Sequence, residues 1–183
     1  MISASLLHRL ILRHQSAKMA FSPRLLLLLT AISGLLAGSW SFAIEKADDC
    51  CPTGWTQLDN RCFIFKNERV DFITAETTCI ILGGNLVSIH SNLENELVRQ
   101  LIFDVTGRNT RTWIGFTDAV EEGSFIWTDG SVVDFTDWAN NRPNNNGNQN
   151  CVNINFRGDD QWNDIPCIRS RTYVCAMDLK PHH

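Results

Sequence analysis

Seven cysteines, all placed after an apolar run near the N-terminus, constrain this 183-residue chain more than any other feature. They are Cys50, Cys51, Cys62, Cys79, Cys151, Cys167 and Cys175. In an exported protein, disulfide bonds are the default use of cysteine. Because seven is odd, at least one thiol has no partner within the chain if the others are bridged. Spacing alone leaves the pairing of the other six open.

Residues 1–43 are typical of a signal peptide, with basic residues first, then a leucine run, then small residues ahead of a cleavage point. All 20 acidic residues follow Ile44. We therefore predict secretion after cleavage behind Ala43, with Met1 or Met19 as the true start. The uncharged stretch is also about long enough for an uncleaved membrane anchor, which is the alternative.

Cleavage would leave an acidic protein. It removes four of the 16 basic residues and no acidic one, so the formal net charge moves from −4 to −8. This balance gives no basic excess to attract nucleic acid. We predict a short segment over 44–50, one domain over 51–178 and a tail over 179–183, with no membrane contact once the leader is cleaved.

Helix and strand patterns both occur in the mature chain, which indicates an α+β domain. One helix is predicted over 72–82, ended by Gly83-Gly84. A second begins after Ser91, which forms a capping box with Glu94. Strands are predicted over 61–65, 86–89, 112–116, 125–127, 151–156 and 172–176. Nine of the 16 residues from 140 to 155 are asparagine. We predict a long polar loop over the first part of this segment, ahead of the strand over 151–156.

Catalysis and a zinc site are both disfavoured. His90 is the only histidine between Cys50 and Cys175, and no C-x2-C pair occurs. General acid–base chemistry needs two titratable groups in altered environments, and zinc needs clustered thiolates or imidazoles. We therefore predict that the chain is not an enzyme.

Several short motifs together resemble the C-type lectin-like domain family. They are Cys51-Pro52 with Gly54-Trp55, the helix with Cys79, Trp113-Ile114-Gly115, Trp127 with Asp129-Gly130, and Trp162-Asn163-Asp164 before Cys167. The Leu82–Leu86 segment is most similar to secreted fish lectins, a group that includes type II antifreeze proteins. The resemblance implies two helices, small antiparallel sheets and a long polar loop, held by disulfides.

The resemblance also implies which cysteines pair: Cys51 with Cys62, Cys79 with Cys175, and Cys151 with Cys167. The Cys79–Cys175 bridge would close a long loop. In the chain-entropy model such a bridge stabilises the folded protein by about 4 to 5 kcal/mol. Cys50 is left over. It is either an unpaired thiol or the link of a homodimer.

Sugar-binding members of the family hold calcium with a Glu-Pro-Asn or Gln-Pro-Asp motif, a later Glu and Trp-Asn-Asp. The matching ligand-binding positions in this sequence are Arg142, Asn144, Gln149, Asn163 and Asp164. A guanidinium has no lone pair for a cation. We therefore predict a degenerate calcium site, with Asn144, Asn163 and Asp164 as the remaining metal ligands. Arg142 would instead pair with an acidic ligand or fold back onto Asp164.

Three further residues are weaker candidates. Asp118 and Glu122 match an auxiliary calcium site of some family members, but we expect both to be solvated loop charges. Trp138 flanks the polar loop and either packs it or contacts a ligand, since aromatic faces stack on sugar rings in lectins.

The most consistent function is a secreted, lectin-like recognition protein. It would bind a glycan, a glycoprotein or another protein partner through the long loop. The alternative is an ice-binding protein like the type II antifreezes, because the loop presents neutral asparagines.

Overall fold

A computed structural model describes residues 50–155, 157 and 160–179. The predicted signal peptide, the segment 44–49 and the tail beyond Leu179 lie outside these residues, so their boundaries stay predictions. Among the described residues there are two helices, α3 (Phe72–Ile81) and α4 (Asn92–Thr106). No helix in this part of the chain is long and apolar enough to span a membrane.

The strands join in one connected sheet with the order β1-β2-β8-β4-β6-β7, to which β3 adds on β8 and β5 on β4. Neighbours are antiparallel except β4 and β8, which are parallel. The strand bounds are β1 (Thr56–Leu58), β2 (Arg61–Val70), β3 (Asn85–Leu86), β4 (Thr112–Thr117), β5 (Ile126–Trp127), β6 (Cys151–Ile154), β7 (Asn163–Ile165) and β8 (Arg171–Asp178).

Six of these strands match predicted ones, with some differences at the ends. The strand predicted over 86–89 is regular only at Asn85–Leu86, although Val87 still donates to the Val174 carbonyl at 2.9 Å. The short strands β1 and β7 were not predicted. The polar pair Asn163-Asp164 lies in β7 and is buried, which a period-two apolar pattern does not reveal.

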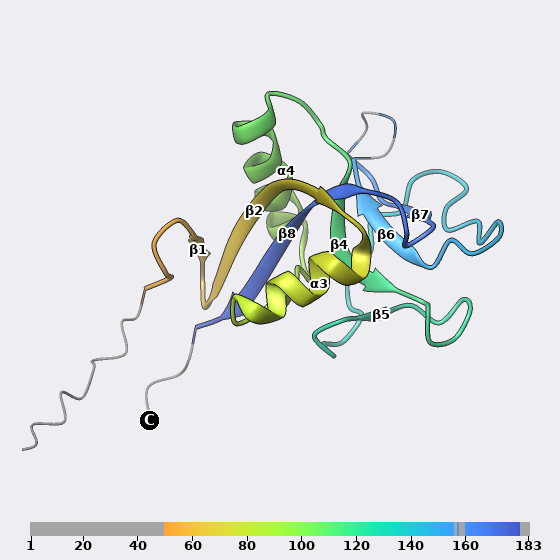
Figure 1. Ribbon diagram of the computed structural model, residues 1–183, viewed down its shortest axis with the longest axis horizontal. Helices are drawn as coiled ribbons and strands as arrows, with labels where there is room; N and C mark the ends of the chain where they lie inside the picture. The colour runs from red at the N-terminus through yellow and green to blue at the C-terminus, as the bar shows by residue number, and fades with distance from the viewer. Residues whose placement is uncertain (1–49, 156, 158–159, 180–183) are drawn as a thin grey trace, which may run out of the picture. The chain divides into compact units, whose positions relative to one another are not determined.

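The two helices lie on opposite faces of β8. Tyr173 and Cys175 pack with α3, whereas Val174 and Ala176 pack with α4. This follows from the alternation of side chains along a strand. Figure 1 shows α3 crossing in front of β8 and α4 behind β2.

Both helices begin at a capping side chain, and the cap of α4, Ser91, is the one that the sequence predicted. Asp71 Oδ1 accepts a hydrogen bond from Thr74 N at 2.8 Å, and Ser91 Oγ accepts one from Glu94 N at 3.2 Å. The end of α3 requires glycine, because a Cβ on Gly84 would lie 2.0 Å from the Ala176 carbonyl oxygen. Gly84 thus lets the end of α3 approach β8 closely.

The three disulfides are those that the resemblance implied: Cys51–Cys62, Cys79–Cys175 and Cys151–Cys167. Cys79–Cys175 joins α3 to β8, and Cys151–Cys167 joins the start of β6 to the segment after β7. Cys50 is exposed and unbridged. These bridges brace the strands on which the long loop rests.

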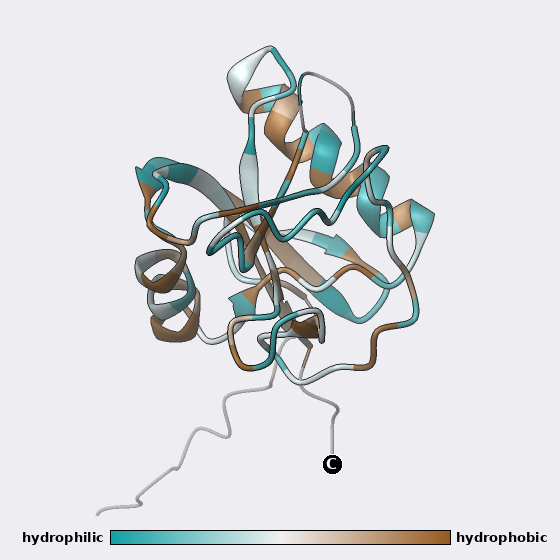
Figure 2. Cartoon of the chain, turned by 90° about the vertical axis from the view of Figure 1, so that its right-hand side faces the viewer, coloured by the Kyte–Doolittle hydropathy of each residue, from teal (hydrophilic) through white to brown (hydrophobic). Residues whose placement is uncertain are grey.

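The long loop runs over residues 128–150, between β5 and β6. It is tied to the segment before β7, because Ala139 N donates to the Trp162 carbonyl (3.0 Å) and Trp162 N donates to the Asp137 carbonyl (2.8 Å). Figure 2 looks onto this side of the domain and shows hydrophilic loop segments in front of apolar strands.

Candidate functional site

Asp164 in β7 fixes the backbone of the long loop. Its side chain is fully buried, and its Oδ2 accepts hydrogen bonds from the backbone N–H groups of Asn144 (3.0 Å) and Asn145 (2.8 Å). A carboxylate that accepts from backbone N–H groups makes strong, charge-assisted hydrogen bonds. The predicted site residues 144 and 164, twenty positions apart, therefore lie side by side.

Arg142 lies next to the same carboxylate. One guanidinium nitrogen is 3.8 Å from Asp164 Oδ1, and the Arg142 side chain is only 17% exposed. The peptide bond between Arg142 and Pro143 is cis. Arg142 thus folds back towards Asp164, one of the two arrangements predicted from the sequence.

Arg142, Gln149, Asn163 and Asp164 line one cavity of about 450 Å³. Around this part of the loop several buried side-chain oxygens have no hydrogen-bond partner within the described structure. These atoms are Asn145 Oδ1, Gln149 Oε1, Asn150 Oδ1, Asn163 Oδ1 and Asp164 Oδ1. Buried polar atoms are normally partnered. An unpartnered set at a cavity is therefore suited to a ligand that donates hydrogen bonds or to a cation.

The oxygens suit calcium in type, but the charge does not. Calcium affinity increases with the number of carboxylates, and the predicted ligand positions hold only Asp164, facing the guanidinium of Arg142. No group of three or more His, Cys, Asp or Glu side chains that could hold a metal occurs in the described part of the chain. The residues present do not fit a tightly held calcium ion.

The expectation for Asp118 was wrong. It is not a solvated loop charge, because the residue is only 1% exposed. Its Oδ2 accepts from Gly123 N at 2.8 Å, while Oδ1 has no hydrogen-bond partner. The turn at Gly123 folds the chain back over the carboxylate, which sequence spacing did not indicate. Glu122 is exposed, as expected.

Trp138 belongs to an aromatic cluster under the loop. Its ring centroid lies 5.0 Å from Phe125, 5.8 Å from Phe116 and 6.2 Å from Trp162. The residue is partly buried against the core, and it is not among the residues that line the cavity. Packing thus accounts for much of its surface, and its contact with a ligand stays a prediction.

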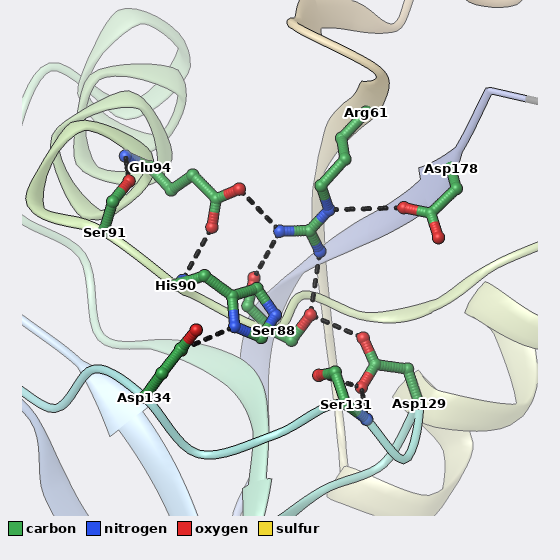
Figure 3. Close-up of polar contacts among 9 residues, drawn as sticks. All are labelled: Arg61, Ser88, His90, Ser91, Glu94, Asp129, Ser131, Asp134 and Asp178. Atoms are coloured by element: carbon green, nitrogen blue, oxygen red, sulfur yellow. Dashed lines mark hydrogen bonds and ion pairs between the residues drawn. The ribbon is translucent and has the colours of Figure 1, made fainter.

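A second polar cluster centres on Arg61 and holds the first part of the long loop through Asp129 and Asp134, but it shares no residue with the cavity at Arg142 (Figure 3). The Arg61 guanidinium donates to Glu94 Oε1 (2.7 Å), the Ser88 carbonyl (3.2 Å) and Ser88 Oγ (2.8 Å), and it pairs with Asp178 (3.5 Å). Ser88 Oγ in turn donates to Asp129 Oδ2 at 2.5 Å. This arginine is neutralised by near carboxylates and is a structural element.

Sequence reasoning missed three arginines, Arg111, Arg169 and Arg171, which line the same cavity as Arg142. They come from the start of β4, the turn before β8 and the start of β8. No local motif joins these positions. The signal that could have found them is the concentration of Arg residues in a chain whose net charge is negative.

The fold and the loop define a disulfide-bonded recognition domain of the lectin type. Residues 68–177 match the family model of the lectin C-type domain, and the chain belongs to this family. The galactose-specific lectin nattectin of Thalassophryne nattereri is 40% identical over 136 residues, covering 74% of this chain and 85% of nattectin. The type-2 ice-structuring protein of Hemitripterus americanus is 33% identical over 133 residues, covering 73% and 78%.

The solved structures give the same assignment. The structure of herring type II antifreeze protein superposes with a TM-score of 0.66 at 33% identity, covering 71% of this chain and all of that one. The predicted family and fold are thereby confirmed.

Proposed function

We propose that this chain is a secreted recognition protein that binds carbohydrate, or a protein partner, through the long loop without a tightly held calcium ion. The observation that carries the proposal is that Gln149 Oε1, Asn163 Oδ1 and Asp164 Oδ1, from residues that line one cavity, are buried and have no hydrogen-bond partner in the described structure. Sugar hydroxyls donate hydrogen bonds, so they are suited to such acceptors. Lectins among the relatives support a binding role over a catalytic one.

A glycan array tests this proposal, probed with the mature protein in calcium and again in EDTA. We expect the same glycans to bind in both conditions. Asn163→Ala should weaken binding about tenfold, because it removes one hydrogen-bond acceptor from the cavity. Asn67→Ala, at an exposed position of β2, is the matched control. Binding that disappears in EDTA would contradict calcium independence, and no glycan binding at all would leave only the protein-partner version.

Ice binding is the second candidate, favoured by similarity to the herring antifreeze protein and the type-2 ice-structuring protein. The loop also exposes neutral asparagines at positions 140, 144, 146 and 148. Thermal hysteresis of the dilute mature protein tests it, and freezing without hysteresis would remove this candidate.

Cys50 is proposed to link two chains, because it is an exposed, unbridged cysteine at the edge of the domain. Non-reducing gel electrophoresis should show a dimer that Cys50→Ser abolishes. Unchanged mobility in the variant would exclude the linkage.

A further inference from the structure

A strongly basic surface adjoins the long-loop site. The cavity that contains Arg142 shares Arg111 and Arg171 with a second cavity of about 250 Å³. Together the two cavities are lined by six arginines, defined here as the arginine groove: Arg69, Arg108, Arg111, Arg142, Arg169 and Arg171. They are half of the twelve basic residues that follow Ala43, in a part of the chain whose net charge is −8.

Strand pairing brings these arginines together. Arg69 precedes Val70, which pairs with Arg171 across β2 and β8. The Ser170 carbonyl accepts hydrogen bonds from both Arg69 Nη2 (3.3 Å) and Arg171 Nη1 (2.8 Å). Arg111 lies directly before β4, whose first residue, Thr112, pairs with Thr172. The groove therefore rests on the rigid ends of three adjacent strands.

Arginines outnumber carboxylates along the groove. Asp164 is the only carboxylate among the described residues that line the two cavities. Burial, together with the like charges of Arg111, Arg69 and Arg169, lowers the pKa of Arg171 below its ordinary value. The Arg171 Nε–H group is buried and has no hydrogen-bond partner in the described structure. Clustered like charges destabilise the folded protein, and a bound anion would relieve the repulsion.

The lining residues also indicate what kind of anion suits the groove. Guanidinium groups bind sulfate and carboxylate groups through paired hydrogen bonds. In the first cavity the neutral amides of Gln149 and Asn163 lie beside the arginines and suit hydroxyl groups. A ligand that carries both hydroxyls and anionic groups matches this combination. No aromatic residue is among the described residues that line either cavity, so the groove lacks the platform on which nucleic-acid bases stack.

We propose that the arginine groove binds an acidic saccharide, with its sulfate or carboxylate groups on Arg111, Arg169 and Arg171 and its hydroxyls on Gln149 and Asn163. This inference rests on the proposed carbohydrate-binding function and names the class of sugar. Arg142 adds positive charge to the same cavity, beside Asp164.

The test uses fluorescence anisotropy of the mature protein with labelled dextran sulfate, polygalacturonate and neutral dextran. Dextran sulfate and polygalacturonate separate a sulfate from a carboxylate preference, and binding to either one supports the proposal. Neutral dextran should bind at least about tenfold more weakly, and raising the salt concentration should weaken the acidic complexes, because exposed charges are screened. Failure of both acidic polysaccharides to bind would overturn the proposal.

The variant Arg111→Gln/Arg169→Gln changes two exposed arginines of the groove. We expect it to weaken binding of the acidic polysaccharide about tenfold and to reduce the salt dependence. The matched control, Lys66→Gln/Arg99→Gln, removes the same charge outside the groove and should change binding less than about twofold. Arg69→Gln/Arg108→Gln in the second cavity is an independent variant if the first does not fold. An equal loss in the control would overturn the proposal.

A single-stranded oligonucleotide with as many charges as the dextran sulfate tests whether the groove binds nucleic acid as well as it binds an acidic saccharide. Binding as tight as that of the polysaccharide would also overturn the proposal. Neutral glycans that bind on the array while both acidic polysaccharides fail would leave the proposed function intact and remove only this inference. No glycan binding of any kind would remove both.

Discussion

Arg61 lies beside the part-buried carboxylate of Glu94 and Arg142 beside the fully buried one of Asp164, and the surroundings of the two arginines differ. Arg61 meets Glu94 at 2.7 Å and also reaches Ser88 and Asp178. Arg142 is 3.8 Å from Asp164, at a cavity where several oxygens have no hydrogen-bond partner. The first region is satisfied within the chain, whereas the second keeps acceptors and charge that a ligand could use. The same residue type thus stands in two different settings, one within the fold and one at the cavity where we propose that a ligand binds.

The largest expected effect is on stability at the satisfied region. Arg61→Met should lower the free energy of unfolding by about 3 kcal/mol, because the part-buried Glu94 loses its ion pair and Ser88 loses two hydrogen bonds at the same time. Arg142→Met, the same change at the loop, should cost less than about 1 kcal/mol, since Asp164 keeps its two backbone hydrogen bonds. Urea unfolding followed by fluorescence measures both. Equal losses of unfolding free energy in the two variants would show that the two arginines do not differ in their contribution to stability.

The next effect concerns calcium at the loop. Arg142→Glu combined with Gln149→Glu changes the summed charge of the ligand positions from zero to −3. We expect calcium to stabilise this variant by about 2.7 kcal/mol when its concentration is about a hundred times the dissociation constant. Thermal unfolding with calcium or EDTA measures the change.

The unchanged protein should show little shift under the same conditions. Glu94→Gln in the Arg61 cluster is a further control, because it alters charge at none of the predicted calcium-ligand positions. A calcium-dependent shift of similar size in the unchanged protein would contradict the conclusion that its residues do not fit calcium.

The smallest effect is a pH dependence in the Arg61 cluster. Partial burial alone would raise the pKa of Asp129, but hydrogen bonds from Ser131 and Ser88 and the charge of Arg61 lower it below 3.8. The stabilisation by the ionised group is therefore present above pH 3.8 and is lost as pH falls through the lower folded pKa. Because Asp129 is still more than a third exposed, solvent screens its charge, and the contribution should stay below about 1 kcal/mol.

Unfolding free energies measured from pH 7 down to about pH 2.5 test this. Asp129→Asn should lose stability at neutral pH and show a shallower decline in acid. Asp104→Asn, an exposed change on α4, should behave like the unchanged protein. An identical acid decline in both variants would show that Asp129 does not contribute.

Local signals predicted much of the fold. The helices follow from short-range chemistry: Ser91 was predicted to cap the second, and Gly83-Gly84 was predicted to follow the end of the first, which ends at Ile81. The cap at Asp71 was not predicted. The disulfide pairing came from the resemblance, because six cysteines have many possible pairings.

The site was predictable only in part, because its elements meet in space and not in sequence. Arg142 and Asp164 stand in short motifs that resemble those of the family, so the sequence alone predicted that they belong to the site. Arg111 and Arg171 stand in none, and only the parallel pairing of β4 with β8 brings them together. Asp118 was misjudged because the burial of a loop carboxylate depends on the turn that follows it.

Asp164 has a consequence for how this surface can diversify. Its carboxylate secures the loop backbone at Asn144 and Asn145, so a change there would alter loop shape and ligand chemistry together. Positions 142 and 149 carry their chemistry in side chains at the cavity and can vary more independently of the backbone. A library randomised at 142 and 149 with Asp164 held constant should therefore yield folded domains with altered specificity, whereas randomising position 164 should mainly yield proteins with misshapen loops.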